Sequence, residues 1–292
     1  MHHQLAALSR ACLEAEVSAT PKPGLVDRNN TGSHRDMDHG TFLTSIAALR
    51  PFFAEFFLLG WDHWDLADEP LFALLREKGV GAEQAMFAAT GGINTHKGMI
   101  FSAAILCGAL GRLHGGVLPV TLSQLREGCA ALGRQALSDF EAASLPTAGM
   151  RCYREQKVLG IRGEAAAGFP AAAQVALPAL RRWKAQGVCL NDRALYALLH
   201  LIAHVEDTNM IHRGGAAEAA RRREEAQALL PSLTPDTIVP TLHRLDEAYI
   251  ARNLSPGGCA DLLSLALALE FLAECGLILP DPEAGTPLSH IY

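Results

Sequence analysis

The stretch "PGGCADLLSLALALEFLAEC", residues 256–275, decides the fold. Leucine and alanine fill it, and both favour the α-helix. Ser255 is the expected N-cap, and Pro256 suits the first helical position because its missing N–H would have no partner there. Because Glu270 and Glu274 interrupt the apolar run, it is typical of a buried helix and not of a membrane span. The stretch therefore predicts a core helix that begins at a glycine-rich loop.

Similar helical patterns fill the rest of the chain. Apolar residues make up 49% of the sequence and aromatic residues 6%, and Val/Thr-rich alternating runs are nearly absent, which favours helices over sheets. Residues 99–113 are strongly apolar and predict a central helix, Pro51 is a candidate kink, and Gly79–Gly81 predict an interruption. The predicted helical runs are 4–18, 41–59, 69–88, 99–113, 122–141, 171–186, 192–205, 216–230, 240–252 and 256–275.

These patterns predict one all-α fold: a single large multi-helix domain over residues 1–279, with active-site loops at helix termini and a weakly ordered tail at 280–292. The net charge of −6 argues against nucleic acid or an anionic membrane as partner. Seven cysteines without a CxxC pair are typical of reduced thiols, and no signal peptide is evident, so we expect a cytoplasmic protein.

Four loops concentrate polar residues that a plain connection would not need. They are "PKPGLVDRNNTGSHRDMD" (21–38), "GGINTHKG" (91–98), "EDTNMIHRGG" (206–215) and "NLSPGGCAD" (253–261). Together they suggest one ligand that carries several phosphates, a divalent cation and a bond whose cleavage needs proton transfer. We therefore expect the four loops to meet in one pocket.

The first loop has two interpretations. Asp27 and Asp36 are either turn-forming or helix-capping residues, or carboxylate ligands of Mg²⁺, which binds oxygen and bridges to substrate phosphates. His34 fits an acid/base role or a phosphate contact better than Mg²⁺ ligation.

The second loop offers an anion site at a helix start. Asn94 or Thr95 could cap a helix that begins near His96, and Lys97 adds a positive charge. The spacing of a Walker A motif is missing, so the loop is not a P-loop. The pattern alone does not separate a cap from a binding site.

The third and fourth loops also have structural alternatives. Asp207 follows a buried helix, where its charge has the wrong sign for the helix dipole, so it needs Arg213 or a metal as partner. Gly257 and Gly258 weaken a first helical turn, which is tolerable where a ligand approaches the backbone N–H groups, and Asp261 lies one turn further on the same face. A cap with ordinary packing explains this pattern equally.

Five segments in this order resemble the ATP:dephospho-CoA triphosphoribosyltransferase family, also called triphosphoribosyl-dephospho-CoA synthases. They are "SATPKPGLVDRNNTGSHRDMD", "GGINTHKG", "GIRGEAAAGFP", "DTNMIHRGG" and "NLSPGGCADLL", and they extend from about residue 10 to 275. The resemblance implies an all-helical enzyme that transfers the 5-triphosphoribosyl group of ATP to the 2′-OH of 3′-dephospho-CoA with release of adenine. The product is the precursor of the prosthetic group of the citrate lyase or malonate decarboxylase acyl carrier protein. A separate holo-acyl-carrier-protein synthase would receive it.

The resemblance implies which positions form the site, and we assign their roles from the chemistry of the residues. The product is an α-riboside, so one in-line displacement at C1″ is expected, with a general base for the attacking hydroxyl. The expected catalytic residues are His96 or Asp261 as the base and His34 as the acid for adenine. The expected Mg²⁺ ligands are Asp27, Asp36 and Asp207. The expected substrate-binding residues are Lys22, Arg28, Asn94, Thr95, Lys97, Arg162, Glu164, Asn209, Arg213, Gly214, Gly215, Ser255, Gly257 and Gly258.

Two other functions fit the same residues. One is a Mg²⁺-dependent hydrolase of nucleotide or ADP-ribosyl N-glycosides, in which water replaces the acceptor hydroxyl. The other is a non-catalytic nucleotide-binding module. The sequence leaves open the oligomeric state, a homodimer included, and which of the two carrier proteins is served.

Overall fold

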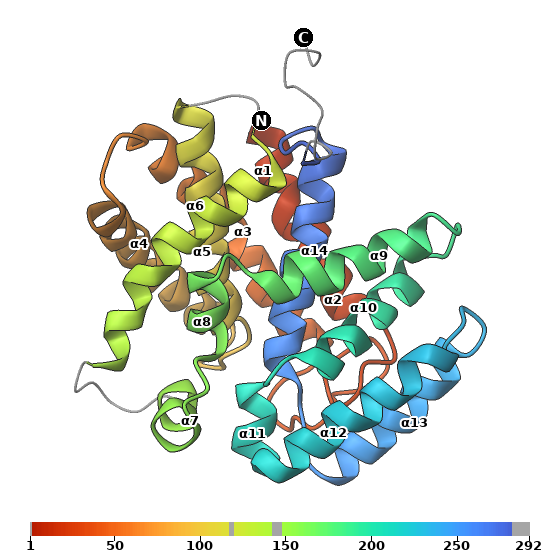
Figure 1. Ribbon diagram of the computed structural model, residues 1–292. Helices are drawn as coiled ribbons and strands as arrows, with labels where there is room; N and C mark the ends of the chain where they lie inside the picture. Colours follow the sequence, from red (N-terminus) through yellow and green to blue (C-terminus); the bar gives the residue numbers. More distant parts are fainter. Residues whose placement is uncertain (1, 117–119, 142–147, 282–292) are drawn as a thin grey trace.

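The computed structural model describes residues 2–116, 120–141 and 148–281, and in this part of the chain it is helical without strands (Figure 1). The helices are α1 (His2–Ser9), α2 (Ala15–Ser18), α3 (His39–Asp62), α4 (Asp68–Ala89), α5 (Lys97–Gly116), α6 (Leu122–Arg134), α7 (Ala148–Gln156), α8 (Gly160–Ala166), α9 (Leu177–Lys184), α10 (Leu190–His204), α11 (Thr208–Gly214), α12 (Ala216–Leu229), α13 (Ile238–Ala251) and α14 (Gly257–Glu274). Turns of π-helix at Arg10–Glu14 and Ala171–Ala176 and of 3₁₀-helix at Gln135–Phe140 and Leu230–Ser232 extend these helices.

The all-α prediction is confirmed, and every predicted helical run is helical in the structure. The interruption expected at Gly79–Gly81 is wrong, because α4 continues through both glycines. Residues 148–156, 160–166 and 208–214 form helices that the sequence patterns did not predict. Of the tail expected at 280–292, residues 282–292 lie outside the described part.

Helices α3 and α5 pack closely because glycines face each other between them. A Cβ atom on Gly60 would lie 2.0 Å from the carbonyl oxygen of Gly108, and one on Gly111 would lie 1.9 Å from that of Phe57. Both helices are long and apolar enough to cross a membrane by length and composition. In the structure they pack on each other, and 72% of the most apolar stretch of α5 is buried inside the protein.

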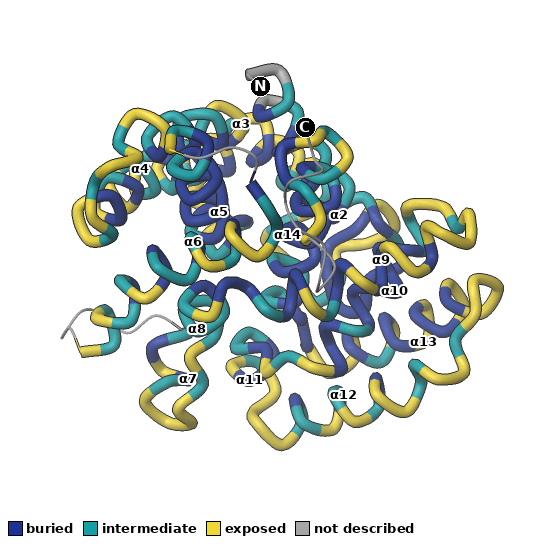
Figure 2. The backbone as a smooth tube through the Cα atoms, turned by 45° about the horizontal axis from the view of Figure 1, so that its top comes forward, coloured by how far each residue is buried: buried dark blue, intermediate teal, exposed yellow. Residues whose placement is uncertain are grey.

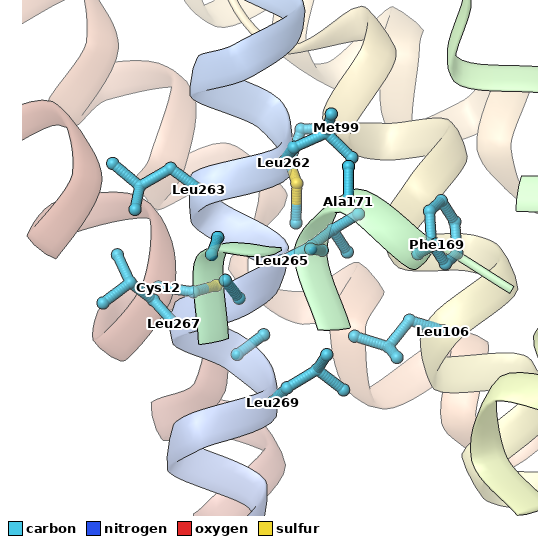
Figure 3. Close-up of a cluster of buried hydrophobic side chains, with 14 of the residues drawn as sticks. Cys12, Met99, Leu106, Phe169, Ala171, Leu262, Leu263, Leu265, Leu267 and Leu269 are labelled. Atoms are coloured by element: carbon cyan, nitrogen blue, oxygen red, sulfur yellow. The ribbon is translucent and has the colours of Figure 1, made fainter. Parts of the chain in front are cut away.

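Helix α14 is the central helix, and it runs through the middle of the molecule with other helices around it (Figures 1 and 2). Leu262, Leu263, Leu265, Leu267 and Leu269 are all buried, although they do not share one face of the helix. Figure 3 shows them between the N-terminal helices, α5 and the π-helical segment at 171–176. A helix that is apolar on all sides must be enclosed on all sides, as predicted from its sequence.

Charged groups at the C-terminal end of α14 are neutralised inside this core. Glu270 is buried, and its Oε1 lies 3.2 Å from Nη1 of Arg193 and 3.5 Å from Nζ of Lys184. The N-terminal end of α14 differs, because it opens on the side where α7, α8 and α11 lie together (Figure 1). These short helices surround the site.

Candidate active site

The four polar loops meet in one pocket of about 810 Å³ at the N-terminal end of α14. Its walls come from the segment before α3, the start of α5, the α7–α8 segment, and the starts of α11 and α14. The expected site residues that line it are Lys22, His34, Asn94, Thr95, His96, Lys97, Arg162, Glu164, Asp207, Asn209, Arg213, Ser255, Gly257, Gly258 and Asp261. The expected residues that do not line it are Asp27, Arg28, Asp36, Gly214 and Gly215.

Asp27 organises its own loop. Its Oδ1 accepts hydrogen bonds from the backbone N–H groups of Asn29 at 2.7 Å and Asn30 at 3.1 Å. Its Oδ2 accepts from the hydroxyl of Thr20 at 2.8 Å and the N–H of Lys22 at 2.9 Å. Four donors occupy this buried carboxylate, which leaves little capacity for a metal. The turn-forming interpretation fits Asp27 better than metal ligation.

The other expected residues outside the pocket also have local explanations. Arg28 and Asp36 are exposed and do not line the pocket. Gly215 has φ +81° and ends α11, and a Cβ on Gly214 would lie 2.5 Å from the side chain of Leu254. Both glycines therefore shape the chain between α11 and α12.

The structure does not bring the three expected metal ligands together. Among the described residues, no group of three His, Cys, Asp or Glu side chains could hold a metal ion. Asp27 faces its loop, Asp36 is exposed, and only Asp207 lines the pocket. An all-aspartate Mg²⁺ cage therefore does not fit these residues.

Asp207 joins the starts of two helices. Its Oδ1 accepts from the N–H groups of Asn209 at 2.8 Å and Met210 at 3.0 Å, so it caps α11. Its Oδ2 accepts from the N–H of Cys259 at 2.8 Å, in the first turn of α14. The partner of this buried charge is thus a set of N–H groups at two positive helix ends, instead of the Arg213 or metal that we expected. Burial still raises the pKa of Asp207 above its ordinary value, and these N–H groups oppose the shift.

Ser255 is not the N-cap of α14. The helix begins at Gly257 after Pro256, and the hydroxyl of Ser255 instead lies 3.0 Å from Nε2 of His34. Nη2 of Arg213 donates to Nδ1 of the same ring at 3.3 Å, so His34 is neutral with its proton on Nε2. Burial and then the charge of Arg213 lower the pKa of His34. A neutral His34 that accepts from Arg213 fits a role in positioning Arg213 better than the expected role as the acid for adenine.

Arg213 keeps its charge available to the pocket. Its Nη1 donates to the backbone oxygen of Ser33 at 2.9 Å and to Oδ1 of Asn253 at 3.0 Å, which are neutral acceptors. It forms no ion pair with a carboxylate in the described part of the chain. By contrast, Lys97 pairs with Glu83 at 2.7 Å and Arg162 with Asp139 at 3.1 Å.

The loop at 91–98 uses most of its polar groups within the protein. Oδ1 of Asn94 accepts from the N–H of Lys97 at 3.1 Å, as expected of a cap. The hydroxyl of Thr95 donates to that of Ser45 at 2.7 Å, and the Ser45 hydroxyl lies 2.8 Å from Nδ1 of His96. Burial, and to a lesser degree the charge of Lys22, lowers the pKa of His96 to about 3, so the ring is neutral. A neutral ring with so low a pKa is a weak general base.

Asp261 lines the pocket from the N-terminal part of α14. A Cβ on Gly98 would fall 2.1 Å from its Oδ2, so the glycine at the start of α5 makes room for this carboxylate. Asp261 accepts no hydrogen bond and forms no ion pair with any residue that the structure describes. Burial, followed by the charges of Glu16 and Asp207, raises its pKa well above the ordinary value. These properties suit a general base.

Glu16 is a pocket residue that the sequence patterns did not reveal. It is buried in α2, directly after the π-helical turn, and it lines the pocket. Its carboxylate accepts a hydrogen bond from the buried ammonium group of Lys22. Burial raises the pKa of Glu16 and the charge of Lys22 opposes this shift. One signal was available: Glu16 falls on the same helical face as the apolar Leu8 and Cys12. Lys22 is therefore held by Glu16 on one side and lines the pocket on the other.

The α8 segment supplies a further part of the pocket wall. Oε2 of Glu164 accepts from the N–H of Ala171 at 3.1 Å, and burial raises the pKa of Glu164. The guanidinium of Arg162 lies 5.7 Å from the ring centre of Phe140 and bonds to Asp139. Both side chains are thus fixed at the pocket edge.

Comparison with known proteins shows the family of the chain that forms this pocket. The family model described as ATP:dephospho-CoA triphosphoribosyl transferase matches residues 2–277. The chain belongs to this family. It is 42% identical over 274 residues to a probable 2-(5''-triphosphoribosyl)-3'-dephosphocoenzyme-A synthase of Albidiferax ferrireducens, covering 91% of this chain and 90% of the relative. It is 44% identical over 260 residues to the synthase of that name from Pectobacterium atrosepticum, covering 88% and 85%. No solved structure matches the chain. The family resemblance seen in the loop motifs is confirmed.

Proposed function

We propose that this pocket transfers the 5-triphosphoribosyl group of ATP to the 2′-hydroxyl of 3′-dephospho-CoA and releases adenine. The observation that carries the proposal is the union of two unlike features in one pocket. One is Arg213, a cation without a carboxylate partner in the described chain; the other is Asp261, an enclosed carboxyl group that lacks a donor there. Family membership supports the same reaction.

Arg213 and the start of α14 form the proposed triphosphate end. The N–H groups of Gly257 and Gly258 lie in the first turn of an 18-residue helix, where the helix dipole favours an anion. Asn209 is packed over this turn, since a Cβ on Gly257 would lie 2.7 Å from its Nδ2. The glycines and Arg213 line the same pocket and would hold the triphosphate, whose binding energy positions C1″ for attack.

Asp261 is the proposed general base. The 2′-hydroxyl oxygen bonds to C1″ while the bond from C1″ to adenine N9 breaks and its electron pair leaves with adenine. The carboxylate of Asp261 takes the hydroxyl proton, and the departing adenine takes up a proton from water. Asp261 then returns its proton to the hydroxide that remains, so the carboxylate is restored. In the transition state C1″ carries positive charge, which the neighbouring carboxylates of Glu16 and Asp207 stabilise.

Mg²⁺ remains a proposal, and we place it with the substrate. Mg²⁺ keeps several waters and commonly binds to nucleotide phosphates with one or two protein carboxylates. Because the expected aspartate set does not assemble, we propose that the ion arrives bound to ATP. Activity should then follow the concentration of the Mg²⁺–ATP complex, and the apo protein should show no tight Mg²⁺ binding in calorimetry.

Adenine release measured by chromatography tests the reaction. Wild-type protein with Mg²⁺ and ATP should release adenine only when 3′-dephospho-CoA is present, and the second product should gain the mass of the triphosphoribosyl group. Adenine release without the acceptor would favour the hydrolase. ATP binding without any adenine release would favour the nucleotide-binding module.

Arg213→Gln tests the triphosphate end. Loss of a charge-assisted contact to phosphate should raise KM for ATP about ten-fold or more, with a smaller effect on kcat. Lys97→Gln is the matched control, because the Lys97 ammonium is already paired with Glu83 on the pocket rim. Equal effects of the two variants would argue against a special role of Arg213.

The destination of the product is a separate proposal. We propose that a distinct holo-acyl-carrier-protein synthase takes the product for a citrate lyase or malonate decarboxylase carrier in the cytoplasm. Gene neighbourhood would distinguish the two carriers.

A further inference from the structure

One buried polar atom in the pocket has no protein partner. His96 is 4% exposed and lines the pocket, and its Nε2 makes no hydrogen bond within the described part of the chain. A buried donor or acceptor without a partner is costly, so one that a native pocket keeps calls for an explanation, and a partner on a bound ligand is one that can be tested.

The hydrogen-bond chain behind the ring defines what Nε2 offers. Nδ1 of His96 lies 2.8 Å from the Ser45 hydroxyl and 3.1 Å from the Thr95 hydroxyl. Because the Thr95 hydroxyl donates to Ser45, we assign the Ser45 hydroxyl as the donor to Nδ1. A neutral imidazole whose Nδ1 accepts carries its proton on Nε2. With this assignment the ring is neutral and offers an N–H donor at Nε2, from a residue that lines the pocket.

The surroundings of this donor are aromatic and apolar. The ring of Phe42 packs edge-on against His96 with 5.0 Å between ring centres, and Phe87 and Met37 also line the pocket. The other polar groups of the 91–98 loop are occupied, because Asn94 caps Lys97 and Lys97 pairs with Glu83. A flat, mostly apolar group with a hydrogen-bond acceptor on its edge fits this wall better than a phosphate does.

We propose that His96, Phe42 and Phe87 form the subsite for the adenine base of ATP, with the Nε2–H of His96 donating to a ring nitrogen of the purine. This rests on the proposed transferase function. This assigns the "GGINTHKG" segment to the base of ATP, in contrast to the phosphate site that its sequence predicts. The aromatic rings supply contact area for the purine, and the donor supplies orientation.

The position of this subsite suits the reaction. Gly98 follows His96 by two residues and touches the carboxylate of Asp261, so the base subsite adjoins the proposed general base. Arg213, at the proposed triphosphate end, lines the same pocket. As the bond to N9 breaks, the purine ring gains negative charge, and a hydrogen bond to a ring nitrogen becomes stronger.

Equilibrium binding of purine analogues tests the proposal without turnover. The affinities of Mg²⁺ complexes of ATP, 1-deaza-ATP, 3-deaza-ATP and 7-deaza-ATP would be measured by calorimetry in the absence of acceptor. We expect one deaza analogue to bind wild-type protein about ten-fold more weakly than ATP, as for a lost buried hydrogen bond. The triphosphate of purine riboside, which lacks the exocyclic amino group, should bind as ATP does.

Variants complete the cycle. His96→Phe should bind ATP and the discriminating analogue equally, because the donor is gone from both complexes. His114→Phe is the control: His114 is also buried, and its Nδ1 also lacks a partner among the described residues, but it does not line the pocket. That variant should discriminate as wild type does.

Two results would overturn the subsite. One is equal binding of all three deaza analogues by wild-type protein, which needs no variant to fold. The other is discrimination that survives in His96→Phe. Adenine release with acceptor decides the transferase function separately, so analogue discrimination without transfer would refute the function and leave the subsite standing.

Discussion

Helix α14 carries two acidic side chains, Glu270 in the core and Asp261 in the pocket wall, and their surroundings differ. Glu270, near its C-terminal end, lies within 3.5 Å of two cations, Arg193 and Lys184. Asp261, near its N-terminal end, has neither a cation nor a hydrogen-bond donor beside it in the described chain. Glu270 has its charge balanced by the protein, whereas Asp261 is left to be completed by a proton or a ligand.

The difference separates a structural acid from a functional one on the same helix. Burying a charge is tolerated when partners surround it, and breaking such a pair is expensive. A carboxyl group held in a pocket without partners contributes nothing comparable to stability, and its raised pKa suits proton transfer. Substitution should therefore affect activity at one end of α14 and stability at the other.

Asp261→Asn should give the largest effect. Loss of the general base should lower kcat of adenine release by about a thousand-fold, within the usual range for such groups. The free energy of unfolding in urea should stay the same or rise, because a half-buried carboxyl group without a partner in the described chain is removed. Near-normal turnover would exclude Asp261 as the base.

Glu270→Gln should do the reverse. Leaving Arg193 buried without its partner should cost about 3 kcal/mol of unfolding free energy, measured by urea denaturation. The kcat of the folded fraction should match wild type, because Glu270 does not line the active pocket. A thousand-fold loss of kcat in this variant would break the comparison.

Asp207→Asn should fall between the two. Asn offers one acceptor oxygen for the two helix starts that Asp207 now caps, so we expect a loss of about 1 kcal/mol in stability. A moderate fall in activity should follow from movement of the α14 start. A loss of activity as large as that of Asp261→Asn, with unchanged stability, would instead indicate direct contact with the reacting groups.

The smallest effect concerns pH. Because the folded-state pKa of Asp261 is raised, its contribution to stability is complete below the unfolded pKa and is lost as pH rises through the folded value. Wild type should therefore lose stability relative to Asp261→Asn as the pH increases over that interval. Parallel stability curves for the two proteins would contradict the shift.

Long helices were predictable because their patterns repeat over several turns. Residues 99–113 and 256–275 are apolar enough to define core helices without tertiary information. Helices α7, α8 and α11 have seven to nine residues and are rich in glycine or charge, so they show too few periods to detect. The helix does not break at Gly79–Gly81 because α4 is buried both before the glycines, at Leu71 and Leu75, and after them, at Ala82 and Met86. This packing outweighs a cost of about 1 kcal/mol per glycine.

The site was predictable as a set of loops but not as a set of contacts. The polar residues of the four loops led us to expect that these loops meet, and most of the expected residues line one pocket. The partner of Asp207 is a backbone group of Cys259, and backbone donors leave no trace in the residue pattern. Aspartate is a common metal ligand, so the sequence alone cannot distinguish Asp27 from one. Only the structure shows that its oxygens already accept hydrogen bonds from the protein.

The double cap by Asp207 also bears on the order of assembly. The N–H of Cys259 belongs to the last helix of the described chain, 52 residues after Asp207. During synthesis Oδ2 of Asp207 can accept this hydrogen bond only after α14 has been made and has packed in place. A nascent chain that stops before Gly257 would have most of the helical bundle and an open catalytic centre, so the enzyme should become competent only when its final helix docks.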